Sequence, residues 1–301
     1  LAMIKETAGD SYENARSFNQ ELTFNQTQKF FEERGIKFGE TQMRTLHFIG
    51  EDNTYTNLAF LLSEQCTHTI KAAVFEGSTK TVFKNRKEFS GSLLVQLEDA
   101  FSYINQYNRT RSEFPGLYRV DARDYPIEAI REALINAIVH RDYSFSASIL
   151  IRMFDDRIEI VSPGGLPSGI TEDEYLAGKL SVLRNRILAN VFYRLGFVEI
   201  FGTGITRIKQ LYETGLKKPD FEISENTIKI VLPVLEKDLN LTDDERLIYK
   251  NLSKTMLKPI SEIVSHVPFG KSKTTKLLKD MCEKGVIAIE GKGRGTKYII
   301  K

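Results

Sequence analysis

A helix with a narrow polar stripe is the most informative pattern of the chain. The segment REALINAIVHRDYS, residues 131–144, has apolar residues almost all round a helix. Glu132, Asn136 and His140 are four residues apart, so they stack on one face. Pro126 suits a helix's first turn, where its missing N–H costs nothing. The pattern predicts a buried helix from about Pro126, whose polar stripe faces either a satisfied polar seam or a ligand.

Two strands follow this helix. Alternating apolar residues predict strands at 149–153 and 158–160, with FDDR as the turn between them. Farther along the chain, FEIS and TIKIVLPVL are expected to form two more strands that close the segment at about residue 235.

Two glycine segments interrupt these elements. The second strand runs into Ser162, Pro163, Gly164 and Gly165. A later segment stands immediately before a helix expected to begin near Ile205, and it consists of Gly202, Thr203 and Gly204. Glycines before a helix let backbone N–H groups approach phosphates, which the positive end of the helix dipole also attracts. One Gly-x-Gly alone is weak evidence, but its position after a polar-striped helix and a strand ending in Gly-Gly favours a phosphate site.

The last 60 residues predict a separate module. Thr242 and Glu245 form a capping box that opens a helix. A second helical stripe follows at 260–267, and the turn PFG leads to a third helix over 271–285. A hairpin over 286–301 closes the chain. Helix, helix, turn, helix, hairpin is the order of a winged helix-turn-helix.

The first 119 residues mix short strands and helices. Residues 67–77 and 80–83 are expected to form a strand pair, and 91–106 an amphipathic helix. No catalytic constellation stands out there, so a packing role is favoured. We therefore expect three parts: an accessory α/β region over 1–119, a central domain over 120–235 and a winged helix over 241–301.

Composition is that of a soluble globular protein large enough for two or three cores. The chain has 301 residues, of which 41% are hydrophobic and 27% charged. No apolar run approaches the roughly 20 residues that span a bilayer, and no secretion leader is visible, so we expect a cytoplasmic protein with no membrane partner. Cys66 and Cys282 match no metal or redox spacing and are expected to be reduced. The chain begins at Leu1, and we expect it to be a fragment of a longer protein.

Charge is unevenly divided along the chain. Residues 241–301 carry 13 Lys and Arg against 7 Asp and Glu, a net +6, whereas the other 240 residues carry −4, which together give the formal +2. A basic module on an acidic body suggests that the end of the chain meets a polyanion.

These motifs together resemble a known superfamily. Glu132-x-x-x-Asn136, followed by a strand, a glycine turn and Gly-Thr-Gly, resembles the Bergerat ATP-binding fold of the GHKL superfamily, which includes gyrase, histidine kinases and MutL. More closely, REALINAIVHRDYS, DDRIEIVSPGGLPSGI, RLGFVEIFGTGITRI and the basic tail are similar to a family of transcriptional regulators. These are often labelled RecG-related helicases and typically carry an upstream Schlafen-AlbA DNA-binding domain. The resemblance implies an α+β fold: an α/β sandwich of a mixed sheet with helices on one face, plus the winged helix.

The resemblance also implies roles for individual residues. Asn136 would hold Mg²⁺ that bridges the phosphates of ATP, and Glu132 would orient and deprotonate the attacking water. These roles agree with the preference of Mg²⁺ for oxygen ligands and with general-base chemistry one turn away. His140 would meet a phosphate or a lid residue. Glycine-segment residues would wrap the nucleotide, namely Gly164, Gly165, Gly202, Thr203 and Gly204.

One position departs from the superfamily. An aspartate normally ends the second strand and accepts a hydrogen bond from the adenine amino group, and the matching residue here is Ser162. A hydroxyl accepts more weakly than a carboxylate and also donates. Weak and poorly selective nucleotide binding is therefore expected.

Basic residues predict that the tail binds double-stranded DNA. They lie on the third helix and at the tip of the hairpin, namely Lys271, Lys273, Lys276, Lys279, Lys292 and Arg294. Winged helices also serve as protein-binding modules, so that alternative stays open. The P-loop-like string FGKS has Ser265 where the motif needs its first glycine, so a P-loop helicase is rejected.

The sequence therefore favours a DNA-binding regulator with a GHKL-like nucleotide domain. An active Mg²⁺-dependent ATPase that couples hydrolysis to a conformational switch is one alternative, and a scaffold that binds no nucleotide is another. A homodimer is also left open.

Overall fold

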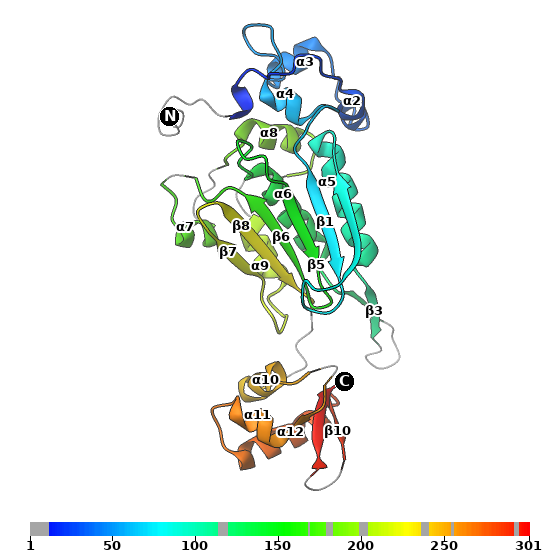
Figure 1. The fold of residues 1–301 in the computed structure, drawn as a ribbon, viewed down its shortest axis with the longest axis vertical. Coiled ribbons are helices and arrows are strands. Elements are labelled where there is room, and N and C mark those ends of the chain that lie inside the picture. The colour runs from blue at the N-terminus through cyan, green and yellow to red at the C-terminus, as the bar shows by residue number, and fades with distance from the viewer. Residues whose placement is uncertain are drawn as a thin grey trace. The chain divides into compact units, whose positions relative to one another are not determined.

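The computed structural model describes residues 12–113, 120–167, 169–178, 183–198, 204–235, 241–253, 256–291 and 295–301. These residues fall into two compact units (Figure 1). The larger unit lies within Leu1–Glu213 and Lys217–Leu235, and the C-terminal unit lies within Thr214–Leu216 and Glu236–Lys301.

The larger unit is built around a six-stranded sheet in the order β2-β1-β5-β6-β8-β7. Its strands are β1 (Ile70–Phe75), β2 (Phe83–Phe89), β5 (Ile149–Met153), β6 (Arg157–Pro163), β7 (Asp220–Ile223) and β8 (Thr227–Pro233), and a separate pair is formed by β3 (Thr110–Glu113) and β4 (Val120–Arg123). Within the sheet β1 and β5 are parallel and all other neighbours are antiparallel, so the sheet is mixed. The α+β class expected from the sequence is confirmed.

Helices cover one face of this sheet and one of its ends. They are η1 (Tyr12–Asn14), α2 (Asn25–Glu32), α3 (Glu40–Thr45), α4 (Asn57–Leu61), α5 (Leu93–Tyr107), α6 (Ile127–Val139), α7 (Glu172–Leu176), α8 (Arg186–Arg194) and α9 (Gly204–Leu211). Figure 1 shows α5, α6 and α9 on the same side of the sheet, with α2, α3 and α4 beyond its end.

The polar-striped helix forms where its pattern predicts. Pro126 stands at the N-cap of α6, and His140 at the C-cap still has helical dihedral angles. Eight residues of α6 are buried, which explains its apolar circumference. The helix packs against β6, β8, α5 and α9, so its polar stripe faces neighbouring elements rather than bulk water.

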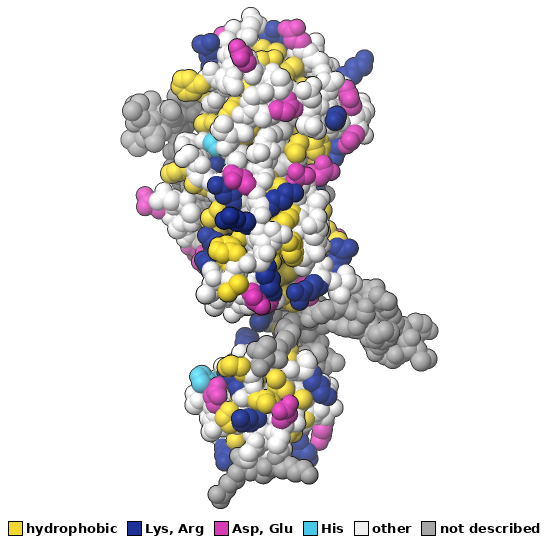
Figure 2. Space-filling view, turned by 45° about the vertical axis from the view of Figure 1, so that its right-hand side comes forward, with side chains coloured by type: hydrophobic (Ala, Val, Ile, Leu, Met, Phe, Trp, Pro, Cys, Tyr) yellow, Lys and Arg dark blue, Asp and Glu magenta, His cyan; other side chains and the backbone are white. Residues whose placement is uncertain are grey.

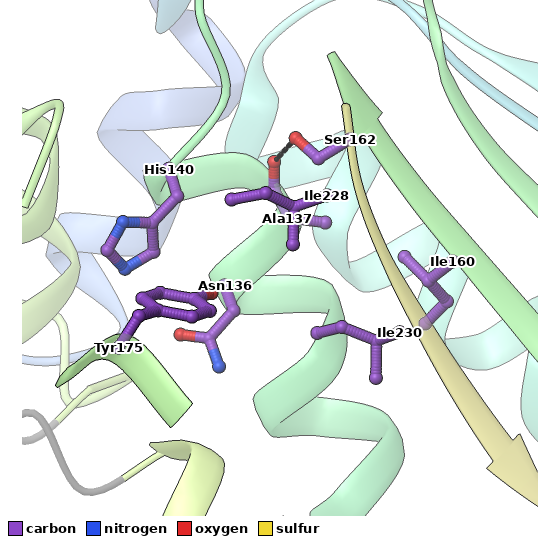
Figure 3. A pocket seen from close by; sticks show the side chains of 8 residues that line it. All are labelled: Asn136, Ala137, His140, Ile160, Ser162, Tyr175, Ile228 and Ile230. Atoms are coloured by element: carbon purple, nitrogen blue, oxygen red, sulfur yellow. Dashed lines mark hydrogen bonds between the residues drawn. The ribbon is translucent and has the colours of Figure 1, made fainter. Parts of the chain in front are cut away.

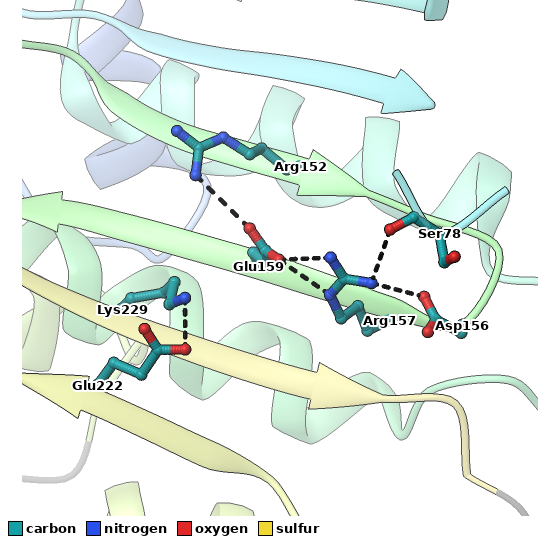
Figure 4. Close-up of polar contacts among 7 residues, drawn as sticks. All are labelled: Ser78, Arg152, Asp156, Arg157, Glu159, Glu222 and Lys229. Atoms are coloured by element: carbon teal, nitrogen blue, oxygen red, sulfur yellow. Dashed lines mark hydrogen bonds and ion pairs between the residues drawn. The ribbon is translucent and has the colours of Figure 1, made fainter. Parts of the chain in front are cut away.

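The opposite face of the sheet carries charged side chains that pair across strands (Figure 4). Arg152 on β5 stands opposite Glu159 on β6, and their charged groups are 3.5 Å apart. Arg157 also contacts Glu159, at 2.9 Å. Lys229 on β8 pairs with Glu222 on β7 in the same way. Such cross-strand pairs suit a sheet face that none of the described helices covers.

The larger unit has one apolar core, to which both the expected accessory region and the expected central domain contribute residues. Residues from both sides of residue 120 belong to the same buried cluster, and β1 lies beside β5 in the sheet. The strand after β1 also differs from expectation, because it spans 83–89 rather than 80–83. β2 is an edge strand with exposed side chains on both faces, so its sequence has no alternation of apolar residues to detect.

The described residues of the C-terminal unit form three helices and a small antiparallel sheet in the order β10-β11-β9. Its elements are α10 (Asp243–Lys250), β9 (Lys258–Pro259), α11 (Ile260–Ser265), α12 (Lys271–Glu283), β10 (Ile287–Glu290) and β11 (Lys297–Ile300). The capping box is present, with Glu245 accepting the N–H of Thr242 at 2.7 Å. The buried Glu245 carboxylate also accepts from Lys284 at 2.6 Å, which ties the start of α10 to the end of α12.

Candidate functional site

The polar stripe of α6 meets the first residue of α9. A Cβ atom added to Gly204 would lie 2.9 Å from Asn136 Nδ2 and 3.1 Å from Glu132 Oε2. Only a glycine lets the α9 backbone come this close to the two side chains without displacing them. The structure therefore brings Glu132, Asn136 and Gly204 together, although their positions in the sequence are about 70 residues apart.

Asn136 has a buried polar atom that lacks a hydrogen bond within the part of the chain that the structure describes. Its Nδ2 has no partner among the described residues. Buried polar atoms are rarely left without a partner, so an orphan of this kind needs an explanation. The amide and the neighbouring glycine backbone have the chemistry to hold a ligand that offers hydrogen-bond acceptors and a hard cation, as a Mg²⁺-phosphate group does. No group of three or more His, Cys, Asp and Glu in the described part of the chain is placed to hold a metal ion.

Glu132 lies one turn earlier and is held by two arginines. Its Oε1 accepts from Arg207 Nη1 at 2.9 Å and from Arg131 Nη1 at 3.1 Å. Only 12% of the Glu132 side chain is exposed. Arg207 comes from α9 and was not expected at the site. Its position could not be inferred from the sequence, because an arginine on an amphipathic helix usually indicates a solvated face.

A small apolar pocket opens beside Asn136 (Figure 3). It lies between α6, α7, β6 and β8 and has about 230 Å³ of unfilled space, including the part open to solvent. Its lining residues are Asn136, Ala137, His140, Ile160, Ser162, Tyr175, Ile228 and Ile230. The free space enclosed by these side chains is about that of one water molecule, so a flat ring enters only after the side chains move apart. The isoleucines of β8 and Tyr175 of α7 were missed at the sequence level, because nothing local distinguishes them from core residues.

His140 forms one side of the pocket with Tyr175. Their ring centroids are 6.2 Å apart in an edge-to-face arrangement. Burial lowers the pKa of the His140 imidazole to about 4, and the positive charge of Arg184 lowers it further in the same direction. The ring is therefore neutral near pH 7, and it offers a flat apolar surface rather than a positive charge for a phosphate.

Ser162 lines the pocket, and its hydroxyl proton is used in a hydrogen bond within the protein. Its Oγ donates to the Ala137 carbonyl at 2.6 Å, and the residue is only 4% exposed. The bond joins β6 to α6 across the floor of the pocket (Figure 3). Because the hydrogen points at the helix, only the lone pairs of Ser162 remain for a ligand.

Gly164 and Gly165 are positioned by backbone packing and do not line the pocket. Gly164 has φ +102°, and a Cβ there would lie 2.7 Å from Asp142 Cβ. A Cβ on Gly165 would overlap Glu225 O and come within 2.7 Å of Ser224 O. Arg184 Nη2 donates to Gly165 O at 2.9 Å, and its Nη1 lies 3.3 Å from Asp142 Oδ2. The turn is thus fixed against its neighbours from several sides.

Other expected residues lie outside the described part of the chain. They are Gly202, Thr203, Lys292 and Arg294. Gly204 is the member of its glycine segment that can be placed.

The four lysines of α12 have different surroundings. Lys271 and Lys276 are exposed and have no ion pair among the described residues, whereas Lys273 contacts Asp244 at 2.5 Å and Lys279 contacts Glu283 at 3.7 Å. Figure 2 shows Lys and Arg side chains on the C-terminal unit interspersed with acidic and hydrophobic ones. Free positive charge on this helix is therefore concentrated at Lys271 and Lys276.

Comparison with known proteins identifies an ATPase-like region. Residues 146–232 match the family model described as "Putative ATP-dependent DNA helicase recG C-terminal". The match supports an ATPase-like domain of a RecG-related family within the larger unit. It runs from just before β5 to the end of β8, so Glu132 and Asn136 of α6 lie outside it.

A solved structure has a similar fold. The DIP2311 protein from Corynebacterium diphtheriae is similar over 100% of this chain, with a TM-score of 0.66 and 19% sequence identity. This chain spans 66% of the length of that protein. At this identity the likeness concerns the fold alone. No curated protein matches the sequence, and no helix in the described residues is long and apolar enough to cross a membrane.

Proposed function

We propose that the chain is a DNA-binding regulator that binds an adenine nucleotide with Mg²⁺ in its larger unit. The observation that carries this proposal is the meeting of the α6 polar stripe with Gly204 beside an apolar pocket. The match to an ATPase-like family over the adjoining strands supports it. The GHKL-type fold of this unit is part of the same proposal.

Each part of the nucleotide has a proposed place. The Asn136 amide would hold Mg²⁺ through its oxygen, and the backbone of α9 at Gly204 would approach the phosphates. When bound, Mg²⁺ neutralises part of the phosphate charge. The adenine ring would enter the pocket between the isoleucines of β8 and the neutral rings of His140 and Tyr175.

Ser162 would select the base. Its proton is used by Ala137, so its oxygen can only accept a hydrogen bond from a ligand. Adenine presents an amino donor at this edge, whereas guanine presents a carbonyl oxygen that a second acceptor repels. We therefore expect modest preference for adenine over guanine nucleotides, in place of the poor selectivity that the sequence suggested.

Hydrolysis by Glu132 is the second candidate function. The Oε2 atom of Glu132 faces Gly204, where phosphates would arrive, and this favours a general-base role. Its other oxygen is engaged by two guanidinium groups, so we expect slow turnover or none. Phosphate release from Mg-ATP, compared between the wild type and Glu132→Gln, distinguishes an ATPase from a protein that only binds nucleotide.

Calorimetry with Mg-ATP, Mg-ADP and Mg-GTP tests the nucleotide proposal. We expect the wild type to bind the adenine nucleotides more tightly than GTP, and Asn136→Ala to lose Mg²⁺-dependent binding. The variant should unfold within about 1 kcal/mol of the wild type, because the amide nitrogen that is removed has no hydrogen-bond partner in the described part of the chain. A large loss of stability with unchanged binding would show instead that Asn136 serves the fold.

The C-terminal unit is proposed to be a winged helix that binds double-stranded DNA. Three helices followed by a hairpin fit that order, and α12 would carry the phosphate contacts. Replacing Lys271 and Lys276 with alanine should lower the slope of log affinity against log salt by about 1.8, at about 0.9 per lost phosphate contact. The matched control replaces Lys273 and Lys279, whose charges are already paired, and should change the slope less. Equal binding by all three proteins would indicate a protein-interaction module.

A further inference from the structure

The Arg207–Glu132 ion pair links the two helices that form the site. Arg207 lies on α9, one turn after Gly204, and its Nη1 donates to Glu132 Oε1 at 2.9 Å. The same oxygen accepts from Arg131, which belongs to α6 itself and also donates to the Phe197 carbonyl. Glu132 therefore has one cation on its own helix and a second on a helix that carries the expected phosphate-binding end.

The spacing between the two helices is too small for a phosphate. The Cβ position of Gly204 is only 2.9 Å from Asn136 Nδ2, so no atom fits between the start of α9 and the amide. A metal ion with its phosphate oxygens needs about 2.1 Å from each ligand to the metal, and therefore more room than this contact leaves. Binding at Asn136 requires the first turn of α9 to move away from α6. Arg207 lies in the turn after Gly204, and its long side chain can stay on Glu132 during this movement unless the ligand offers it a phosphate.

We propose that Arg207 recognises the terminal phosphate of a nucleoside triphosphate by exchanging the Glu132 carboxylate for that phosphate. This inference rests on the nucleotide-binding function proposed above. Guanidinium groups bind phosphate through two parallel hydrogen bonds, and a doubly charged phosphate competes well against a single carboxylate. Glu132 keeps Arg131 as a partner after the exchange, so no buried charge is left unpaired.

The exchange gives the site its preference for triphosphates over diphosphates. A diphosphate lacks the terminal group, so it leaves the Arg207–Glu132 pair intact. A triphosphate removes one of the two donors from Glu132 Oε1 and makes that oxygen available. Arg207 thus connects the number of phosphates on the ligand to the state of the carboxylate that faces them.

Affinities for Mg-ATP and Mg-ADP, measured by calorimetry on the whole chain, test this inference. Arg207→Ala should weaken Mg-ATP binding by about tenfold or more and leave Mg-ADP binding unchanged, because a charge-assisted hydrogen bond is lost only with ATP. Lys209→Ala is the matched control. It removes a positive charge from the same helix, but Lys209 Nζ bonds to the Leu176 carbonyl rather than to Glu132. Its ratio of ATP to ADP affinity should equal that of the wild type.

A double-variant cycle makes the test specific for the exchange. Glu132→Gln removes the negative charge with which the phosphate competes, so it should tighten Mg-ATP binding several-fold without changing that of Mg-ADP. In the Arg207→Ala background the same substitution should give no gain. A gain of equal size in both backgrounds would mean that Glu132 acts on the phosphate directly, which overturns the inference.

The remaining outcomes separate this inference from the proposed function. If both nucleotides bind and Arg207→Ala leaves the affinity ratio unchanged, Arg207 does not contact the terminal phosphate, while nucleotide binding stands. If Arg207→Ala lowers both affinities equally together with the melting temperature, Arg207 has only a structural role. If the wild type binds neither nucleotide, the proposed function and this inference are both wrong.

Discussion

The Gly164–Gly165 turn and the start of α9 at Gly204 both hold glycine backbone against close neighbours, but the neighbours differ in kind. Gly165 faces the carbonyl oxygens of Ser224 and Glu225, which are backbone atoms. Gly204 faces the ends of the Glu132 and Asn136 side chains. Backbone cannot yield without disturbing the sheet, whereas side chains and the start of a helix can move. Gly165 therefore serves the fold, whereas the contacts of Gly204 can rearrange when a ligand binds.

At neutral pH the largest expected effect is that of Gly165→Ala. The added methyl group would overlap Glu225 O, and relief requires β6 or the turn before β8 to shift. We expect the free energy of unfolding of the larger unit to fall by about 3 kcal/mol, at the upper end of the cost of overpacking. Urea unfolding followed by circular dichroism measures it.

Gly169→Ala is the control for that experiment. Gly169 has φ +84°, and apart from its chain neighbours no described atom lies within 4 Å of its Cβ position. Alanine there should therefore cost only the strain of the left-handed backbone, about 1 kcal/mol. If Gly165→Ala costs no more than Gly169→Ala, the 224–226 segment is free to move and the contrast between the two glycine regions fails.

Acidification tests the burial of His140 at the C-terminal end of the polar stripe. Burial, and to a smaller extent the positive charge of Arg184, lowers the pKa of His140 to about 4. Between pH 4 and pH 6.5 the ring is therefore neutral in the folded protein, whereas in an unfolded chain it is protonated. The contribution of His140 to the free energy of unfolding should therefore be complete above pH 6.5. It should fall by about 1.4 kcal/mol for each pH unit as the pH drops toward 4. Burial and Arg141 lower the pKa of His68 to about 4 as well, which adds a second equal contribution.

Unfolding of His140→Gln across this pH range gives the measurement. The variant should lose the contribution of His140, about 1.4 kcal/mol per pH unit, and keep the rest of the wild-type slope. A slope equal to that of the wild type would mean that His140 titrates normally and is accessible to water.

The third effect is that of Gly204→Ala on ligand affinity. Alanine suits a helix, and the atoms it meets are side-chain ends that can shift, so stability should change by less than about 1 kcal/mol. The methyl group would nevertheless occupy the place where phosphates would approach the backbone. We expect Mg-ATP binding to weaken by about tenfold or more in calorimetry. Wild-type affinity in this variant would place the phosphates elsewhere.

Periodicity made α6, β5 and β6 predictable, and it also revealed the polar stripe. Both strands and the helix are buried on defined faces, so their apolar residues recur at the period of the element. β2 lacked that signal because it is an exposed edge strand. The capping box of α7, where Thr171 and Glu174 bond reciprocally, was present in the sequence but overlooked.

The site was predictable only in part, because its contacts depend on elements far apart in the chain. Glu132 and Asn136 could be paired by spacing, but the approach of Arg207 depends on how α9 packs on α6. The two glycine segments carried the same local signal, and only their three-dimensional neighbours distinguish them. The direction of the Ser162 hydroxyl likewise depends on the distance between β6 and α6.

The smallest expected effect concerns Ser162, which joins β6 to α6 and lies next to the Gly164–Gly165 turn. Ser162→Ala removes both the bond to Ala137 O and the acceptor proposed for adenine. One neutral hydrogen bond contributes about 1 kcal/mol net, so the ratio of Mg-ATP to Mg-GTP affinity should fall roughly fivefold. Calorimetry with both nucleotides measures this ratio, and Ser162→Thr, which keeps the hydroxyl, should retain it. If Ser162→Ala leaves the ratio unchanged while stability falls, Ser162 holds the strand to the helix and another group reads the base.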